Sequence, residues 1–183
     1  TYGPLLDGDS RYYWGISQGG IMGGVLMSLS PDVARSTLEV MGQSYSVLLN
    51  RSVDFVPFFG VLALAHTDAR ARAHFLGLVQ MGWDRVEPNG YTKYAMTDTF
   101  PGLPANRRIL MRVALGDHQV TTYGAHIMGC AMNATHLDTG VRDVYGLTKA
   151  TSPIDQDGAV YAEWDFGLPP EPLCNVPLSV CED

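Results

Sequence analysis

The apolar and polar positions near the start of the chain predict a strand, a tight turn and a helix in close succession. Residues 12–16 form a short aromatic and β-branched run, which is typical of a buried strand. The glycine-rich run GISQGG at residues 15–20 interrupts this pattern, and an almost wholly apolar stretch then continues to residue 29. Such a stretch predicts a helix that is buried on nearly all sides.

The rest of the chain continues the alternation of strands and helices. Apolar runs at residues 36–42, 109–115 and 159–166 predict three further strands, and apolar residues at helical spacing predict helices at residues 61–81 and 121–135. Alternation of this kind is typical of parallel sheets. The sequence therefore predicts an α/β fold, with a mostly parallel sheet and helices on both faces.

Two connections do not fit this simple alternation. Residues 45–59 are apolar but irregular, which favours a loop that lines a pocket, although a plain buried loop or an extra strand fits the pattern as well. Residues 82–107 contain several prolines and glycines and predict a long surface excursion. Both connections lie between the second and the third predicted strand.

Composition and charge narrow the class of partner. Of the 183 residues 46% are hydrophobic, and no repeat or low-complexity block divides residues 1–183, so we expect a single domain. The formal net charge of -7 disfavours nucleic acid or an anionic membrane surface as the main partner. The longest apolar run is too short to span a bilayer. We therefore expect a small-molecule partner and no membrane span.

The sequence gives no indication of a cofactor or a metal ion. His66 and His74 lie about two turns apart in a predicted helix, but no third ligand accompanies them. Asp7 and Asp9 resemble the start of a calcium loop, yet the acidic ligands that such a loop needs further on are absent. We therefore expect two solvated or packing histidines and an ordinary turn.

The candidate chemistry lies in the turn at residues 15–20, which contains the pattern G-x-S-x-G. A serine on a sharp strand-to-helix turn needs neighbours without a Cβ atom, and Gly15 and Gly19 would be those neighbours. The turn would expose the Ser17 hydroxyl and place the Gln18 N–H at a helix N-terminus, where it can donate to an oxyanion. The motif resembles the nucleophile elbow of the α/β-hydrolase family, in a form close to that of its carboxylesterases and thioesterases.

A second candidate follows the strand predicted at residues 109–115. Asp117 stands just past the end of this strand, where α/β sheets commonly place ligands and catalysts, although it could instead cap the next helix. Gly116, Asp117 and Val120 resemble the site of the triad acid in α/β-hydrolases. The resemblance therefore implies a serine hydrolase of carboxylic esters, with an acyl-enzyme on Ser17, an oxyanion donor at Gln18 and an acid at Asp117.

The resemblance covers the C-terminal half of the hydrolase fold and lacks one member of the triad. The triad histidine is expected after the last strand, but residues 167–183 contain no histidine. His118 adjoins the acid, whereas His136 should lie at the opposite end of the sheet, too far away to act. A serine without this base should turn over almost no ester. We therefore expect part of a longer enzyme, completed by a second polypeptide, or alternatively a catalytically incomplete subunit or binding module.

Three smaller features bear on the location of the protein and on other chemistry. Cys130 is predicted to be a small core residue, whereas Cys174 and Cys181 could form a disulfide that would favour a secreted or periplasmic location. Residues 138–140 spell Asp-Thr-Gly, the tripeptide of aspartic proteases, but it should end a hydrophobic strand and here follows a predicted helix. The chain begins at Thr1 without a methionine, as a processed polypeptide would.

Overall fold

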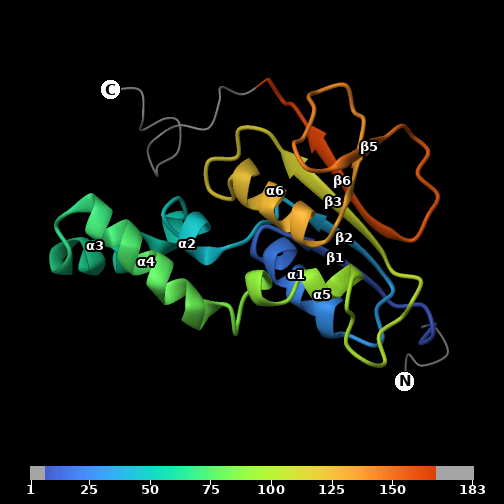
Figure 1. Ribbon diagram of the computed structural model, residues 1–183, viewed down its shortest axis with the longest axis horizontal. Helices are drawn as coiled ribbons and strands as arrows, with labels where there is room; N and C mark the ends of the chain where they lie inside the picture. Colours follow the sequence, from blue (N-terminus) through green and yellow to red (C-terminus); the bar gives the residue numbers. More distant parts are fainter. Residues whose placement is uncertain (1–6, 168–183) are drawn as a thin grey trace.

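A six-stranded, all-parallel β-sheet organises the computed structural model, which describes residues 7–167 (Figure 1). The strand order is β1-β2-β3-β6-β4-β5, so the three strands predicted around Ser17 and Asp117 are neighbours. An α/β fold with a parallel sheet was predicted from the sequence, and the structure confirms it. The strands are β1 (Tyr12–Ile16), β2 (Arg35–Glu39), β3 (Arg108–Ala114), β4 (Thr135–Leu137), β5 (Thr148–Ala150) and β6 (Gly158–Trp164).

The helices that pack on the sheet share one of its faces. In α1 (Gln18–Leu29), a Cβ atom on Gly23 would touch Leu38, and in α6 (Thr122–Ala131), a Cβ atom on Gly129 would touch Tyr161. The strand register aligns Leu38 with Met111 and Met111 with Tyr161, so these side chains point to the same side. The main core lies here, and it includes Met27, Leu38, Met41, Ile109, Met111, Met128, Met132 and Tyr161.

The opposite face of the sheet is not covered by any helix among residues 7–167, although helices were predicted on both faces. Trp14 on β1 is 66% exposed, and its neighbours on that face, Tyr12 and Ile16, are exposed as well. Parallel sheets are normally covered on both faces, so the exposure of these apolar side chains of β1 is unusual. Within the described residues β1 is also an edge strand of the sheet.

Two short strands, β4 and β5, were not predicted, and the helix predicted at residues 121–135 is shorter than expected. Helix α6 ends at Ala131, and the chain turns at Met132 and Asn133 into β4. Strand β4 adds to the edge of β6, and β5 pairs with β4. Three residues per strand are too few to show a clear alternation of apolar and polar positions, so sequence pattern alone misses such strands.

The connection between β2 and β3 contains most of the remaining helices. The helix predicted at residues 61–81 is in fact two helices, because the chain breaks before Asp68, whose side chain accepts a hydrogen bond from the Ala71 N–H (2.8 Å) and caps the second helix. The elements are α2 (Tyr45–Leu48), η2 (Val53–Phe55), α3 (Val56–Ala65), α4 (Ala69–Trp83), η3 (Pro88–Gly90) and α5 (Lys93–Met96).

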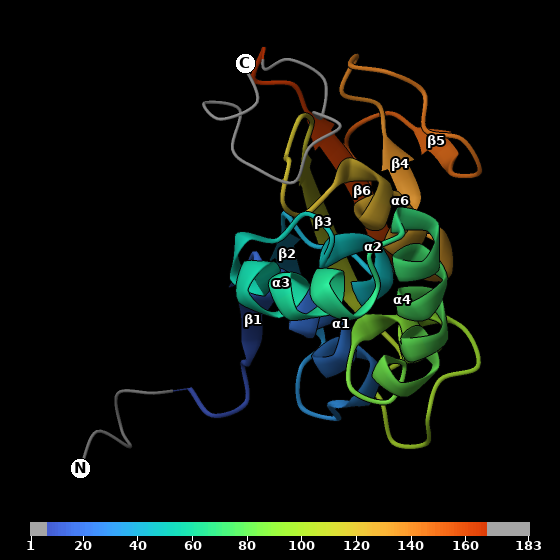
Figure 2. The same ribbon diagram turned by 90° about the vertical axis from the view of Figure 1, so that its left-hand side faces the viewer.

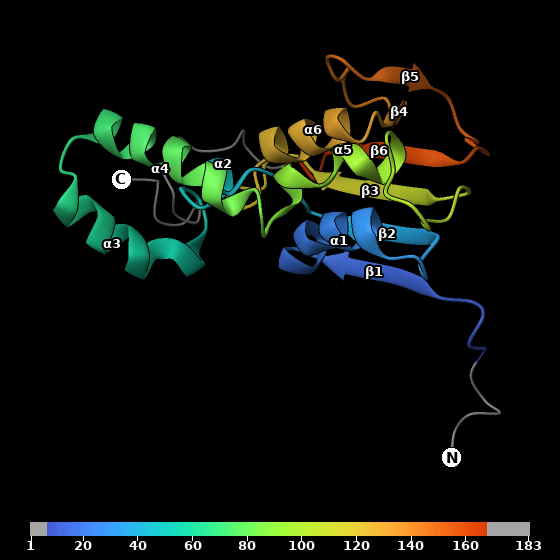
Figure 3. The same ribbon diagram turned by 60° about the horizontal axis from the view of Figure 1, so that its bottom comes forward.

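Helices α3 and α4 form a hairpin, residues 56–83, that extends away from the sheet (Figures 1 and 3). No residue of α3 is buried, and α4 buries Leu76 alone. In Figure 2, which views the molecule from the side of the hairpin, α3 and α4 stand in front of the sheet and α1. No helix among residues 7–167 is long and apolar enough to cross a membrane.

Buried polar side chains attach this hairpin to the body of the protein. Gln80 near the end of α4 accepts a hydrogen bond from the Ser46 N–H (2.8 Å) and donates to Glu87, which is fully buried. Asn89 donates its backbone N–H to Glu87 (3.1 Å) and accepts from the Ser44 hydroxyl (2.9 Å). The base of the hairpin is thus held by hydrogen bonds to buried polar groups, together with the contact between the rings of Trp83 and Tyr45.

Candidate active site

Ser17 occupies a backbone conformation that side chains normally avoid. Its φ of 55° and ψ of -122° match the first central residue of a type II′ turn, where glycine is strongly preferred. The turn is fixed from both sides: the Ser17 N–H donates to the Glu39 carbonyl (3.0 Å), and the Ser17 carbonyl accepts from the Ile21 N–H (2.9 Å). The strand therefore ends at Ile16 and the helix begins at Gln18, with a single strained serine between them.

The glycines that the turn requires are Gly15 and Gly20, whereas Gly15 and Gly19 were predicted. A Cβ atom on Gly15 would lie 2.4 Å from the Gly19 carbonyl oxygen, and one on Gly20 would lie 2.4 Å from the Glu39 carbonyl oxygen. A Cβ atom on Gly19 would approach only the Tyr13 hydroxyl, at 3.7 Å, which is an ordinary contact. The prediction that Gly19 is a steric requirement is therefore wrong, and Gly20 has that role because it faces the next strand.

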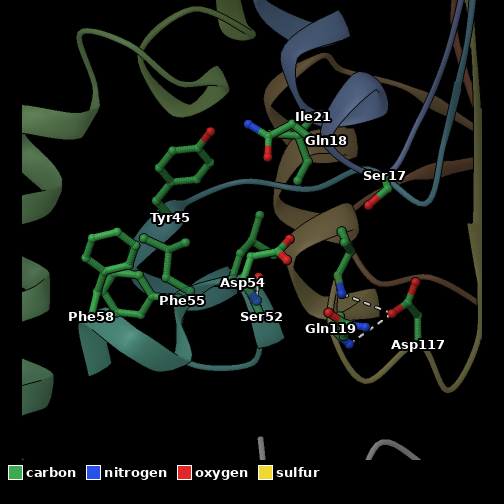
Figure 4. A pocket seen from close by; sticks show the side chains of 13 residues that line it. Ser17, Gln18, Ile21, Tyr45, Ser52, Asp54, Phe55, Phe58, Asp117 and Gln119 are labelled. Carbon is green, nitrogen blue, oxygen red and sulfur yellow. Dashed lines mark hydrogen bonds between the residues drawn. The ribbon is translucent and has the colours of Figure 1, made fainter. Parts of the chain in front are cut away.

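A cleft of about 330 Å³ opens directly in front of Ser17 (Figure 4). Its lining includes all three predicted site residues, Ser17, Gln18 and Asp117. The fold thus brings together the turn between β1 and α1 and the loop that follows β3. The predicted pocket-lining segment at residues 45–59 forms the other side, although it is largely helical. The remaining lining residues are Ile21, Tyr45, Leu48, Leu49, Ser52, Asp54, Phe55, Phe58, Gln119 and Val120.

Asp117 shapes its own turn as well as facing the cleft. Its Oδ1 atom accepts hydrogen bonds from the backbone N–H groups of Gln119 (2.9 Å) and Val120 (3.0 Å), both drawn in Figure 4. The cap of helix α6 is instead Thr121, whose hydroxyl accepts from Tyr123 (3.0 Å) and Gly124. Asp117 thus holds its own loop, and the alternative prediction that it caps the helix is wrong.

None of the five histidines, all of which fall within residues 7–167, lines the cleft. His118 adjoins Asp117, and its Nε2 atom is buried without a hydrogen-bond partner. His136 is not at the far end of the sheet as predicted: it is buried within β4, in register with Tyr161. Four strand spacings separate β4 from β1, or about 19 Å, so His136 is still remote from Ser17. His66, His74 and His126 lie on or beside α3, α4 and α6.

The charges that line the cleft are all negative. Asp54 and Asp117 contribute carboxylates, and none of the 13 lining residues is basic. Burial, followed by the nearby Glu87 charge, raises the pKa of the Tyr45 phenol, so its ring stays neutral. Asp54 belongs to the segment at residues 45–59 that was predicted to line a pocket, but it was not singled out as a site residue. Gln119 was also missed.

The remaining sequence candidates lie elsewhere. Within residues 7–167 no group of three or more histidine, cysteine, aspartate or glutamate side chains is placed to hold a metal ion. Asp138 follows strand β4 rather than a helix, but Lys149 pairs with its carboxylate (3.1 Å) and lowers its pKa. Cys130 was predicted in the core and is exposed. Cys174 and Cys181 lie outside the described residues.

Comparisons with known proteins give weak matches. No protein-family model matches the chain, and no curated protein is significantly similar to it. Two solved structures resemble it at 15% identity: a hydrolase from Pseudomonas aeruginosa PA01 (TM-score 0.34, 86% of this chain) and Est816, an N-acyl homoserine lactone degrading enzyme (TM-score 0.33, 85% of this chain). The chain spans 60% and 62% of their lengths.

Proposed function

We propose that the protein is a serine hydrolase that forms an acyl-enzyme on Ser17 during the hydrolysis of carboxylic esters. The observation that carries this proposal is the backbone of Ser17, a non-glycine residue at φ 55° that faces a cleft. Strain of this kind costs about 1–3 kcal/mol and persists mainly at functional sites, where the surrounding structure enforces it. A serine that served only to cap α1 would not need it, and its side chain forms no capping hydrogen bond.

The neighbouring groups suit the remaining steps of ester hydrolysis. The Ser17 hydroxyl would attack the acyl carbon, and the Gln18 N–H, at the first position of α1, would donate to the developing oxyanion. The helix N-terminus adds a partial positive charge at the same point. Asp117 would orient and charge-stabilise an imidazole, as the acid of a triad does. The apolar residues of the cleft would hold the acyl or alcohol portion.

The base is a histidine that these 183 residues do not bring to the cleft. A hydroxyl needs an acceptor for its proton, and an acid alone does not replace imidazole at neutral pH. We propose that a second polypeptide, or a further segment of a longer chain, supplies this histidine. The position of the five histidines also supports an alternative function, namely a catalytically incomplete subunit or binding module with a hydrolase-like fold.

A covalent probe tests the nucleophile. We expect a fluorophosphonate to label Ser17 in the longest native form of the protein, and the adduct to disappear in Ser17→Ala. Ser52→Ala is a matched control, because Ser52 lines the same cleft but has an ordinary φ of -73°. Absence of an adduct on Ser17, as judged by peptide mass spectrometry, would contradict the nucleophile assignment.

Chemical rescue separates the proposed function from its alternative. If only the base is missing, added imidazole should raise ester turnover by at least about tenfold, since a general base contributes about 10²–10⁴ in rate. The increase should vanish in Ser17→Ala and fall in Asp117→Asn. A protein that binds ester-like molecules, but gives neither an adduct nor a response to imidazole, is the binding module.

A further inference from the structure

One side of the cleft combines a carboxylate with aromatic rings. Asp54 lies between Ser17 and the rings of Tyr45, Phe55 and Phe58, and Figure 4 places these rings on the side of the cleft away from Ser17. The Phe55 and Phe58 rings stack with centroids 5.8 Å apart. Tyr45 is held in place by an edge contact with Trp83, whose ring centroid lies 6.1 Å away. Aromatic faces beside a carboxylate are the surroundings that organic cations prefer.

The Asp54 carboxylate has no cationic partner within the part of the chain described. No ion pair involves it, and its backbone N–H, rather than its side chain, bonds to the Ser52 hydroxyl (3.2 Å). Asp54 is solvent-exposed and lies in the first turn of η2, just before α3, where a negative charge also suits the N-terminal end of a helix. The carboxylate also lines the cleft, where it is available to pair with a cationic group of a ligand.

The charges of the whole cleft and of the whole chain also favour a cationic ligand. The cleft has no basic lining residue, and the whole chain carries a formal net charge of -7. An ester with a carboxylate or phosphate would therefore meet repulsion from both Asp54 and Asp117, and no basic side chain lines the cleft to offset it. A positively charged ester would be drawn toward the cleft and held within it.

We propose that the cleft takes esters bearing a positively charged amine or quaternary ammonium group, held between the Asp54 carboxylate and the rings of Tyr45, Phe55 and Phe58. This inference rests on the proposed ester hydrolysis for its substrate, but the cation subsite itself does not depend on Ser17. The subsite adds a specificity determinant: the reacting carbonyl lies at Ser17, and the charge lies on the side of the cleft formed by residues 45–58.

Matched pairs of esters test the preference. Acetylcholine and 3,3-dimethylbutyl acetate have the same shape and differ in the charge of the alcohol, and betaine ethyl ester and ethyl 3,3-dimethylbutanoate differ in the charge of the acyl group. Each kcat/KM is divided by the rate constant of hydroxide-catalysed hydrolysis of the same ester, because the ammonium group itself activates the carbonyl. At low ionic strength we expect the kcat/KM of at least one cationic ester to exceed that of its neutral partner by about tenfold. The ratio should fall to near one in Asp54→Asn and shrink at high salt. Asp98→Asn, which removes an exposed charge outside the cleft, should keep the ratio.

A binding measurement separates this inference from the proposed function. Trimethyl(propyl)ammonium cannot be hydrolysed, and it should bind Ser17→Ala as tightly as it binds the wild type. Its affinity for Asp54→Asn and for Phe55→Leu should be about tenfold lower. Equal turnover of charged and neutral esters would overturn the subsite while the hydrolase proposal stands. Absence of all ester turnover, together with binding that depends on Asp54, would overturn the hydrolase proposal while the subsite stands. Binding that is indifferent to Asp54 overturns the subsite in every case.

Discussion

The turn around Ser17 and the α3–α4 hairpin lie close to the same cleft, yet their packing is opposite. Around Ser17 the backbone of α1 lies so close to β1 and β2 that Gly15 and Gly20 leave no room for a methyl group. In the hairpin, a Cβ atom on Gly60 or Gly77 would meet no other atom within 4 Å, and α3 buries nothing. Close packing fixes the geometry of a reacting group, whereas a loosely packed wall can adapt to different ligands.

The largest effect should come from adding one methyl group to the tightly packed region. Gly20→Ala forces a Cβ atom to within 2.4 Å of the Glu39 carbonyl oxygen, which is itself fixed by the Ser17 N–H. We expect the free energy of unfolding to fall by about 3 kcal/mol, as overpacking of a rigid site does. Urea denaturation followed by circular dichroism measures the change.

Gly60→Ala is the matched control, because the same methyl group enters a helix with open space around it. We expect it to stabilise α3 by about 0.5–1 kcal/mol, or to leave global stability unchanged if the hairpin unfolds locally. Similar losses in the two variants would contradict the difference in packing.

A second, smaller effect tests the strain stored at Ser17. Ser17→Gly removes the side chain that disfavours φ 55°, and it sacrifices no capping hydrogen bond. We expect the free energy of unfolding to rise by about 1 kcal/mol. Thermal and urea unfolding should agree on the sign.

Ser30→Gly serves as its control at the other end of α1. Ser30 has an ordinary φ of -78°, so glycine gains nothing in the folded state and increases the entropy of the unfolded state. This variant should be destabilised slightly. An equal change in both variants would mean that the conformation of Ser17 carries no strain.

The last effect concerns the base of the hairpin and depends on pH. Burial, and to a smaller extent the nearby Asp84 charge, raise the pKa of Glu87 above the ordinary value of 4.5, against hydrogen bonds from Asn89, Gln80 and Tyr45 that lower it. The folded protein therefore keeps the Glu87 proton to a higher pH than the unfolded chain does. Stability associated with Glu87 is present below about pH 4.5 and is lost as the pH rises through the folded pKa.

Glu87→Gln should remove this dependence. Between pH 4.5 and pH 7 we expect the unfolding free energy of this variant to change less than that of the wild type. The difference between the two slopes is at most about 1.4 kcal/mol per pH unit, the limit for one proton. Hydrogen exchange should locate the change in α4 and α2, which Gln80 joins. Asp98→Asn, at an exposed site, should follow the wild-type profile.

The contrast between the two regions also explains what could be predicted. The strand at residues 12–16, the glycine turn and the apolar helix are local patterns, and they predicted the bounds of β1, the turn and α1 closely. The prediction that this strand is buried was wrong, because one face of β1 is exposed. Asp117 was predicted at the edge of the sheet from its place after a strand. The hairpin was predicted poorly, because a capping aspartate splits an apolar run that looks continuous, and β4 and β5 are too short to give a periodic signal.

Local patterns in the sequence were enough to establish the central strands, the type of fold and the position of a serine between a strand and a helix. These features follow from hydrophobic periodicity and from glycine, which act over a few residues. Tertiary contacts were needed to show that Gly20 rather than Gly19 is crowded, that Asp54 faces the cleft and that His136 lies within a strand. Those facts depend on segments far apart in the chain, and no local pattern encodes such contacts.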